Sequence, residues 1–189
     1  MSNLEIRDVV PGDISSITAI YREAVLHGTA SFELDPPDTT EMLERMQSIV
    51  GSGFPYIVAL NASGALLGYA YANLYRSRPA YRWTCENSVY IDSSAQSMGL
   101  GKKLMEVIVD RCAQLGFRQM VSVIGGADHI ASIKLHERLG FKKVGQLPAT
   151  GFKHGVWLDS ILMQKALGGG SDIVPDENSY PGTLYKPQN

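Results

Sequence analysis

The sequence is short of cysteine, of net charge and of long apolar runs. Its two cysteines, Cys85 and Cys112, are too few for a disulfide framework, and neither has a further Cys or His at metal-ligand spacing, so no metal is expected. The 17 Lys and Arg nearly balance the 19 Asp and Glu, and a net charge of −2 excludes the general basic surface of a nucleic-acid-binding protein. No apolar run approaches the roughly 18 residues of a membrane span.

The start of the chain lacks the basic and apolar regions of a signal peptide. We therefore expect a cytoplasmic protein that has neither a membrane nor a nucleic acid as partner. With 189 residues, of which 44% are apolar, the chain can bury one core, and a second domain is not expected. From Gly168 onward Gly, Pro, Asp, Asn and Ser dominate, which predicts a domain over residues 1–167 and a tail over 168–189. This composition is typical of a flexible extension, or of a strap ordered only against a partner subunit.

Apolar residues recur along the chain with the period of a strand or of a helix. Asp13 and Asp38 are expected to begin two helices as N-caps, and the turn at residues 61–64 joins two strands into a hairpin. The predicted strands cover residues 4–7, 56–60, 66–74, 84–91, 119–124, 141–146 and 156–163. The predicted helices cover residues 14–25, 38–50, 102–115 and 131–139. This order of strands and helices predicts one α/β domain with a mixed sheet.

A glycine pair, Gly99 and Gly101, lies between the predicted strand 84–91 and the helix that begins near Lys102. A helix N-terminus presents unpaired N–H groups and a partial positive charge, which suits a phosphate, and glycines let the backbone approach it closely. An ordinary turn explains the pair equally well on its own. A P-loop is excluded because GxxxxGK[ST] is absent, and Leu104 stands where a dinucleotide-binding GxGxxG needs its third glycine.

Several longer segments carry a family resemblance. Gln96-x-x-Gly99-x-Gly101 resembles the pyrophosphate loop of the GCN5-related N-acetyltransferases, and His129, His136 and Gly140-Phe141 have the spacing of that family's Asn…Tyr-x-x-x-Gly-Phe element. Within this superfamily the sequence is most similar to phosphinothricin and methionine sulfoximine acetyltransferases. That similarity rests on residues 29–33, 83–91, 135–141 and 151–157. The resemblance spans about residues 4–165 and ends before the tail.

The resemblance implies a mostly antiparallel, splayed sheet flanked by helices, with acetyl-CoA between two diverging parallel strands. The pantetheine arm would pair with the strand backbone as an added strand. The residues implied to contact the cofactor are Val89, Tyr90, Ile91, Ser97, Met98, Gly99, Leu100, Gly101, Lys102 and His129. His129 departs from the family's Asn, although either side chain can hydrogen-bond an amide. The N–H donor for the reaction's oxyanion is implied near Tyr90.

Two residues are candidates for proton transfer. Amines are mostly protonated near neutral pH, so a base must expose the lone pair, and Glu86 occupies the position of the base in the similar enzymes. His136 stands where many family members carry the Tyr that protonates the leaving thiolate, and imidazole can do the same or bind substrate. The alternatives are an exposed strand glutamate and a packed helix histidine. Cys85 and Cys112 are poor candidates for a covalent nucleophile, so direct transfer in a ternary complex is expected.

An arginine-rich loop precedes the strand that carries Glu86. Arg76, Arg78 and Arg82 suit a substrate carboxylate or phosphinate, although surface arginines are common. Phe32 and Tyr81 are candidate pocket walls, or else core aromatics. Lys153 and His154 are expected in a loop at the mouth of the site.

We therefore predict an acetyl-CoA-dependent N-acetyltransferase, without a metal, that acts on the α-amine of small L-amino-acid analogues such as phosphinothricin, methionine sulfoximine and methionine sulfone. One alternative keeps the fold but acetylates a polyamine, an aminoglycoside or a protein N-terminus, for which an arginine-rich loop is less suited. Another alternative is a non-catalytic acyl-CoA sensor, which would not need Glu86. A homodimer is expected by family analogy.

Overall fold

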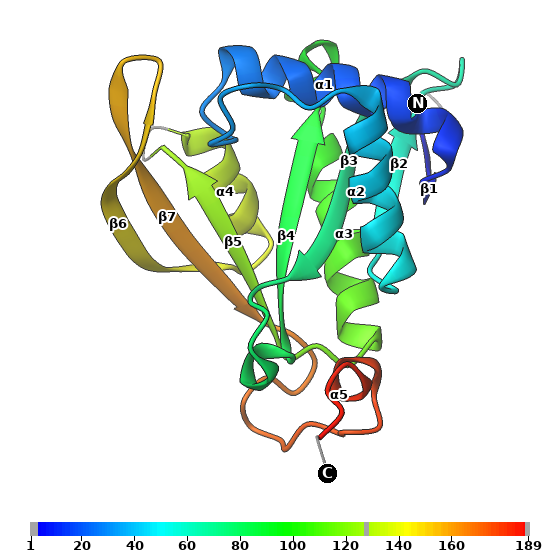
Figure 1. The fold of residues 1–189 in the computed structure, drawn as a ribbon, viewed down its shortest axis with the longest axis vertical. Helices are drawn as coiled ribbons and strands as arrows, with labels where there is room; N and C mark the ends of the chain where they lie inside the picture. Colours follow the sequence, from blue (N-terminus) through cyan, green and yellow to red (C-terminus); the bar gives the residue numbers. More distant parts are fainter. Residues whose placement is uncertain (1–3, 127–128, 188–189) are drawn as a thin grey trace.

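The computed structural model describes residues 4–126 and 129–187, within which seven strands form one mixed sheet (Figure 1). The strands are β1 (Glu5–Asp8), β2 (Tyr56–Leu60), β3 (Leu66–Leu74), β4 (Thr84–Ile91), β5 (Gln119–Gly125), β6 (Lys142–Lys153) and β7 (Val156–Ala166). Their spatial order is β1-β2-β3-β4-β5-β7-β6. Every neighbouring pair is antiparallel except β4 and β5, which are parallel. The predicted mixed sheet is confirmed.

Helices cover both faces of the sheet (Figure 1). One face carries α1 (Ile14–His27) and α2 (Thr39–Gly51), and the other carries α3 (Leu100–Gln114) and α4 (Ile130–Arg138). A short α5 (Tyr180–Thr183) lies near the C-terminal end of α3. Within the described ranges, no helix has the length and apolar character needed to cross a bilayer.

The two predicted N-caps have different outcomes. Asp38 caps α2 as expected, because its carboxylate accepts a hydrogen bond from the Glu41 N–H at 2.9 Å. Asp13 immediately precedes α1, but its carboxylate accepts hydrogen bonds from Arg7 and from the Val10 N–H, at 2.8 Å each, instead of from the first turn of the helix. Asp13 therefore ties β1 to the start of α1 and does not cap the helix through its side chain.

The sheet splays between its two parallel strands. Pairing between β4 and β5 runs through Thr84↔Gln119 and Cys85↔Met120 and ends at Glu86↔Val121. On its other edge β4 stays paired with β3 as far as Ile91. Residues 87–91 of β4 therefore have one free edge, and the two strands enclose a widening gap beyond Glu86.

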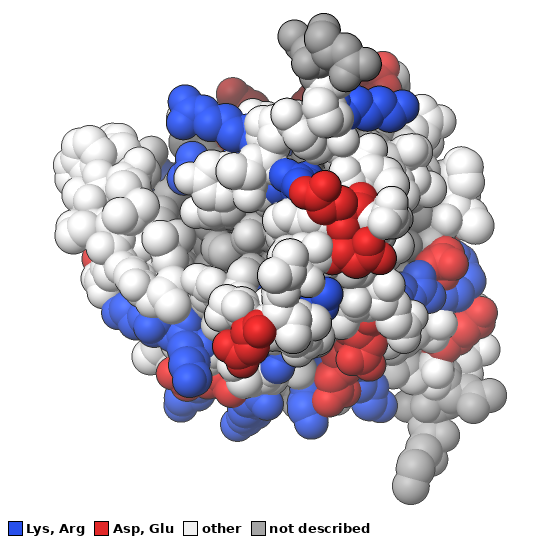
Figure 2. All heavy atoms as spheres, turned by 90° about the horizontal axis from the view of Figure 1, so that it is seen from below, with Lys and Arg blue, Asp and Glu red and all other residues white. Residues whose placement is uncertain are grey.

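The tail makes contacts with the rest of its own chain. The ring of Tyr180 lies edge-on to the rings of Phe54 and Phe117, with centroids 5.9 Å away in both cases. Glu177 forms an ion pair with Arg82 at 3.2 Å. At this end of the molecule acidic and basic side chains are interspersed (Figure 2). These contacts lie within one chain, and the flexible extension or strap stays a prediction.

Candidate active site

A pocket of about 260 Å³ opens where β4 and β5 diverge. Its walls come from the connection between α1 and α2 (residues 30–32), from β4 (residues 86–90), from the end of β5 (residues 122–125), and from His129, Ser132 and His136 around α4. The structure therefore places three of the predicted site residues, Phe32, Glu86 and His136, around one cavity.

The pocket passes through the sheet from one face to the other. Successive residues of a strand point to opposite faces. Tyr90 meets Tyr21 of α1 at 5.0 Å between centroids, so the even-numbered residues of β4, Glu86 among them, face α1 and α2. Asn87 hydrogen-bonds to His136 of α4, so the odd-numbered residues face α3 and α4. Two ligands can thus approach the gap from opposite faces.

Glu86 has the environment of a base. Its side chain is half-buried on the pocket wall. Burial raises the pKa of its carboxyl above the ordinary value, and the positive charge of Arg76 partly offsets this rise. A carboxylate whose pKa is shifted toward neutral accepts a proton more readily near neutral pH than an exposed glutamate does.

His136 is held in a buried hydrogen-bond network. Its Nδ1 lies 2.8 Å from the Ser132 carbonyl oxygen, which can only accept, so Nδ1 carries the proton in the neutral ring. Its Nε2 then accepts from the Asn87 amide at 3.1 Å, and the Ser122 hydroxyl donates to the Asn87 carbonyl oxygen. Burial lowers the pKa of the imidazole. This neutral ring has no proton on Nε2 to donate, so the arrangement favours the packed histidine over the predicted acid.

Sequence reasoning missed Asn87 and Ser122 as members of the site. Both line the pocket and are nearly fully buried, at 6% and 1% exposure. A usable signal is present for Asn87, which interrupts the otherwise apolar row of Cys85, Val89 and Ile91 on one face of β4. A polar residue at such a position needs hydrogen-bond partners. Nothing in the sequence identifies those partners.

The predicted pyrophosphate loop lies on the α3 and α4 face. Gly99 has φ of +75° and immediately precedes α3, which begins at Leu100, two residues before the predicted start. A Cβ at Gly99 would meet nothing within 4 Å, and one at Gly101 would lie 3.2 Å from Leu135 of α4 and 3.9 Å from Ile91 of β4. The N-terminus of α3, the end of β4 and α4 therefore meet at one point.

The remaining loop residues differ in their surroundings. Ser97 has a left-handed φ of +64°, and the Met98 side chain is exposed. Lys102 pairs with Glu106 at 3.3 Å along the exposed surface of α3. The loop's backbone N–H groups, more than its side chains, are thus the groups suited to a diphosphate.

The structure has a free strand edge where the pantetheine arm is predicted to pair. The free edge of β4 at Val89, Tyr90 and Ile91 offers backbone groups to an extended chain. His129 immediately precedes α4 and lines the pocket, and its buried Nδ1 has no hydrogen-bond partner among the described residues. A buried nitrogen without a partner fits an amide of the cofactor arm.

The arginine loop lies outside the pocket. Arg76, Arg78 and Tyr81 are exposed in the connection that leads into the start of β4, and none of them lines the cavity. Arg76 stacks over Tyr75 at 5.1 Å, and its charge still acts on the carboxyl of Glu86. The structure therefore brings the charge of Arg76 within range of Glu86, while Arg78 and Tyr81 lie outside the pocket lining.

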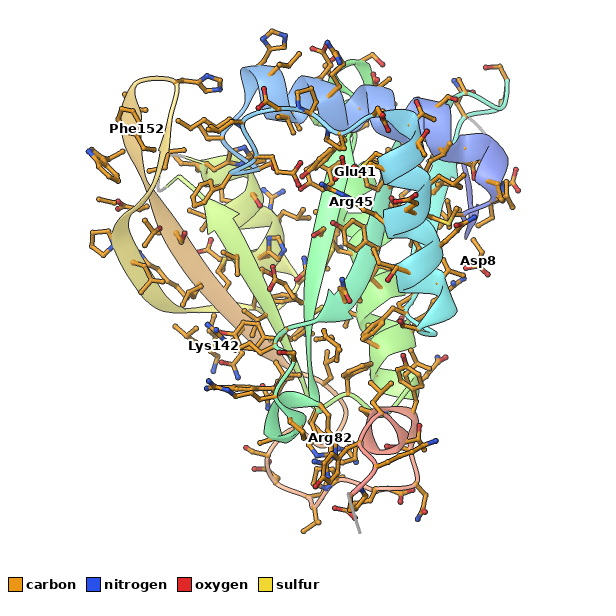
Figure 3. The ribbon with its side chains drawn as sticks, in the orientation of Figure 1. Asp8, Glu41, Arg45, Arg82, Lys142 and Phe152 are labelled. Carbon is orange, nitrogen blue, oxygen red and sulfur yellow. The ribbon has the colours of Figure 1, made fainter. Side chains whose placement is uncertain are left out.

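Arg82 contacts the tail instead of the pocket. Its guanidinium lies over the rings of Trp83 and Tyr185, at 4.9 and 5.2 Å from their centroids, and forms the ion pair with Glu177. Figure 3 shows Arg82 beside the C-terminal segment. Because these partners occupy its planar group, Arg82 is not available to a substrate.

Lys153 and His154 lie where β6 turns into β7. His154 is exposed in the turn, with φ of +51°. Lys153 is only 3% exposed, and its Nζ donates a hydrogen bond to the Ser31 carbonyl oxygen at 2.7 Å. Lys153 thus contacts the segment that lines the pocket without lining it itself. Among the described residues, no group of three or more His, Cys, Asp or Glu could hold a metal ion.

Comparison with known proteins places these features in a family. Residues 6–162 match the family described as "Acetyltransferase (GNAT) domain". A phosphinothricin N-acetyltransferase of Alcaligenes faecalis is 44% identical over 171 residues, which cover 90% of this chain and 86% of that protein. An L-methionine sulfoximine/L-methionine sulfone acetyltransferase of Pseudomonas aeruginosa is 38% identical over 159 residues, or 84% of this chain and 92% of that protein.

A solved structure is similar over nearly the whole chain. The crystal structure of a phosphinothricin acetyltransferase from Sinorhizobium meliloti in complex with AcCoA superposes with a TM-score of 0.94 at 51% identity. The match covers 97% of this chain and 99% of that one. The shared part therefore includes most of the tail.

Proposed function

Since this chain belongs to the GNAT family of acetyltransferases, we propose that it acetylates the α-amine of small L-amino-acid analogues such as phosphinothricin, methionine sulfoximine and methionine sulfone. The observation that carries the proposal is the half-buried Glu86 at the point where β4 and β5 part. The donor is acetyl-CoA, which supplies the acetyl group as a thioester.

Three features of the site have separate roles in this reaction. The free edge of β4 and the N–H groups before α3 hold the donor on the α3 and α4 face. Glu86 accepts the proton that the substrate ammonium loses, which exposes the nitrogen lone pair. Unpaired N–H groups of β4 are available to the oxygen on which negative charge develops. The nitrogen forms a bond to the acetyl carbon, the carbon–sulfur bond breaks, and the second proton that the nitrogen loses neutralises the departing coenzyme A thiolate.

The acceptor is best explained as a small amino-acid analogue. It would enter from the α1 and α2 face, where Phe32 forms a wall and Glu86 is the base. Arg76 supports a substrate that carries a carboxylate or phosphinate, because its charge reaches this side of the pocket. Acetylation removes the positive charge of the amine, so a target that recognises the ammonium no longer binds the product.

Direct transfer fits the surroundings of the cysteines. Cys85 is fully buried, and the neighbouring Cys112 thiol together with burial raises the pKa of its own thiol. A covalent nucleophile needs an accessible thiolate. We predict that Cys85→Ala retains most of the activity, within about threefold of the unmodified enzyme. Isolation of an acetylated Cys85 during turnover would refute direct transfer.

The proposal is tested by a substrate panel. Acetyl-CoA turnover is measured with methionine sulfone, methionine sulfoximine, phosphinothricin, the common amino acids, a polyamine and an aminoglycoside. We expect the analogues to have the highest kcat/KM. A higher kcat/KM for the polyamine or the aminoglycoside would refute the proposed acceptor. Tight binding of acetyl-CoA without turnover of any amine would indicate a non-catalytic sensor.

We also propose that the protein is a cytoplasmic homodimer. The β6 and β7 hairpin exposes an aromatic pair, Phe152 and Trp157, with centroids 5.2 Å apart and exposures of 56% and 66%. Exposed apolar groups of this kind are typical of subunit contacts. Sedimentation of the full chain, and of a chain ending at Leu167, would show whether a dimer forms and whether the tail contributes to it.

A further inference from the structure

The Phe32 ring lies in a slot formed by two glycines from different strands. A Cβ at Gly125, the last residue of β5, would lie 2.7 Å from Cε1 and 3.3 Å from Cδ1 of Phe32, and it would also meet the Thr29 carbonyl oxygen. A Cβ at Gly151 of β6 would lie 3.0, 3.1 and 3.2 Å from Cε2, Cδ2 and Cζ. The two glycines therefore face opposite edges of the same ring.

The Phe32 ring occupies the space that a side chain at Gly125 or Gly151 would need. Carbon atoms in favourable contact are about 3.5–4.0 Å apart, so a methyl group on either side would overlap the ring. Neither glycine has a left-handed φ, and so backbone conformation does not require glycine at these positions. Close approach of the Phe32 ring is the feature that requires glycine at Gly151, where the three nearest atoms all belong to that ring.

The segment carrying Phe32 has no regular secondary structure of its own and is tied to three elements. Lys153 of β6 donates to the Ser31 carbonyl oxygen at 2.7 Å, and Tyr21 of α1 hydrogen-bonds to the Ser31 hydroxyl at 2.9 Å. Arg45 of α2 binds Glu33 at 2.7 Å. In Figure 3, Phe152 marks the β6 and β7 hairpin and Arg45 marks α2, and the connection between α1 and α2 runs between them.

Lys153 is an unusual tether. Its ammonium is almost fully buried, and within residues 4–126 and 129–187 no carboxylate pairs with it. Burying a charge without an ion pair is costly, and the hydrogen bond to the Ser31 carbonyl oxygen offsets part of that cost. The same hydrogen bond holds the segment that carries Phe32 against β6. Burial lowers the pKa of Lys153, and the charge of Glu33 partly offsets this.

We propose that the slot of Gly125 and Gly151, together with the tether of Lys153, fixes the Phe32 ring and thereby sets the size of the acceptor that fits beside Glu86. Phe32 and Glu86 line the same pocket, so a ring held on both edges is a rigid wall on the acceptor side. The inference rests on the proposed function, because it concerns the acceptor of that reaction. Gly151 and Lys153 are positioning residues that act through Phe32.

The test uses Gly151→Ala with Gly145→Ala as its control. Both glycines lie on β6, but a Cβ at Gly145 would meet only Leu162 at ordinary contact distances of 3.6 and 3.9 Å. KM is measured for acetyl-CoA and for whichever amine the unmodified enzyme turns over best. We expect Gly151→Ala to raise KM for the amine about tenfold, with KM for acetyl-CoA and kcat within about threefold, and Gly145→Ala to leave all three unchanged.

Two further variants separate a rigid wall from a general loss of structure. Phe32→Leu removes the ring edges that a Cβ at Gly151 would meet. The factor by which Phe32→Leu raises KM for the amine should therefore be at least about fivefold smaller in the Gly151→Ala background than in the unmodified enzyme. Lys153→Met should raise KM for the amine, and Lys153→Arg should restore part of the loss. Additive effects of Phe32→Leu and Gly151→Ala, or equal effects of Gly151→Ala and Gly145→Ala, would overturn the proposal.

The same measurements keep the two proposals apart. A best amine outside the amino-acid analogues would refute the proposed function, while the Gly151 and Phe32 comparison would still test the slot with that amine. Enlarging the pocket gives a second readout. Phe32→Ala should increase kcat/KM for phenylalanine relative to methionine sulfone by about tenfold if Phe32 limits the acceptor's size. An unchanged ratio would contradict this limit.

Discussion

Replacing Glu86 by glutamine removes the base while keeping the shape of the side chain. A positioned general base contributes about 10²–10⁴ in rate, so we expect kcat/KM of Glu86→Gln to fall by that factor. At about 1.36 kcal/mol per tenfold change, the loss corresponds to about 2.7–5.4 kcal/mol in the barrier. KM for acetyl-CoA should not change, because the donor is expected on the opposite face of β4.

The pH dependence follows from the direction of the pKa shift. Glu86 must be deprotonated to accept a proton, so activity falls as the pH is lowered through its pKa. Burial raises this pKa, and therefore the acid limb lies at a higher pH than for an exposed glutamate. Arg76 lowers the same pKa, so Arg76→Gln should move the limb to still higher pH. In Glu86→Gln this limb should be absent.

The assay follows release of the coenzyme A thiol from mildly acidic to mildly alkaline pH. Cys85 and Cys112 are both buried, so they should not add to the thiol signal in the folded enzyme. Unchanged thermal unfolding and acetyl-CoA affinity would establish that the variant is folded. A turnover of Glu86→Gln within about threefold of the unmodified enzyme, or an acid limb that persists, would remove Glu86 from the role of base.

Two further predictions concern the buried network and the tail. Asn87→Asp places a carboxylate beside Nε2 of His136 and should raise the pKa of the imidazole, as measured by NMR titration; an unchanged or lower pKa would contradict the observed hydrogen bond. Tyr180→Ala should lower the free energy of unfolding by about 2 kcal/mol in a denaturant titration, less than for a fully buried aromatic residue, with little change in kcat. Val174→Ala is the matched control in the tail, because Val174 is 90% exposed and its loss should cost below about 0.5 kcal/mol. Equal losses for the two variants would show that Tyr180 does not anchor the tail.

Local patterns were sufficient to predict most of the fold. The apolar stripe predicted for α3 is buried at Leu104, Met105, Ile108 and Cys112, because a period of 3.6 residues places those positions on one side of a helix. Two details differ: Asp13 does not cap α1 through its side chain, and β6 continues to Lys153, beyond the strand predicted over 141–146. The contacts of the tail were not predictable either. Its Gly- and Pro-rich composition indicates a loop, but Tyr180 finds Phe54 and Phe117 far away in the sequence. Such complementarity between distant segments has no local pattern.

The site was predictable only in part for the same reason. The family resemblance implied Glu86 and the glycine loop, since each belongs to one continuous segment, and the structure places Glu86 on the pocket wall. Arg76, Arg78 and Tyr81 were predicted to contact the substrate. The loop that carries them precedes the first residue of β4, whereas the cavity begins further along the strand, at Glu86. The network of Asn87, Ser122 and His136 joins three elements, and so its geometry appears only in the folded chain.

Among the described residues β4 and β5 form the one parallel strand pair, and this pair explains why the proposed donor site and the proposed base lie together. Parallel neighbours need a crossover, which here is α3 between β4 and β5. The crossover helix must begin near the C-terminal end of β4, so its free N–H groups lie beside the part of β4 that has parted from β5. The helix N-terminus and the free strand edge thus arise from the same connection. Because residues alternate along β4, Glu86 faces the opposite side of the sheet from Asn87, and the amine can reach the gap without crossing the donor's path.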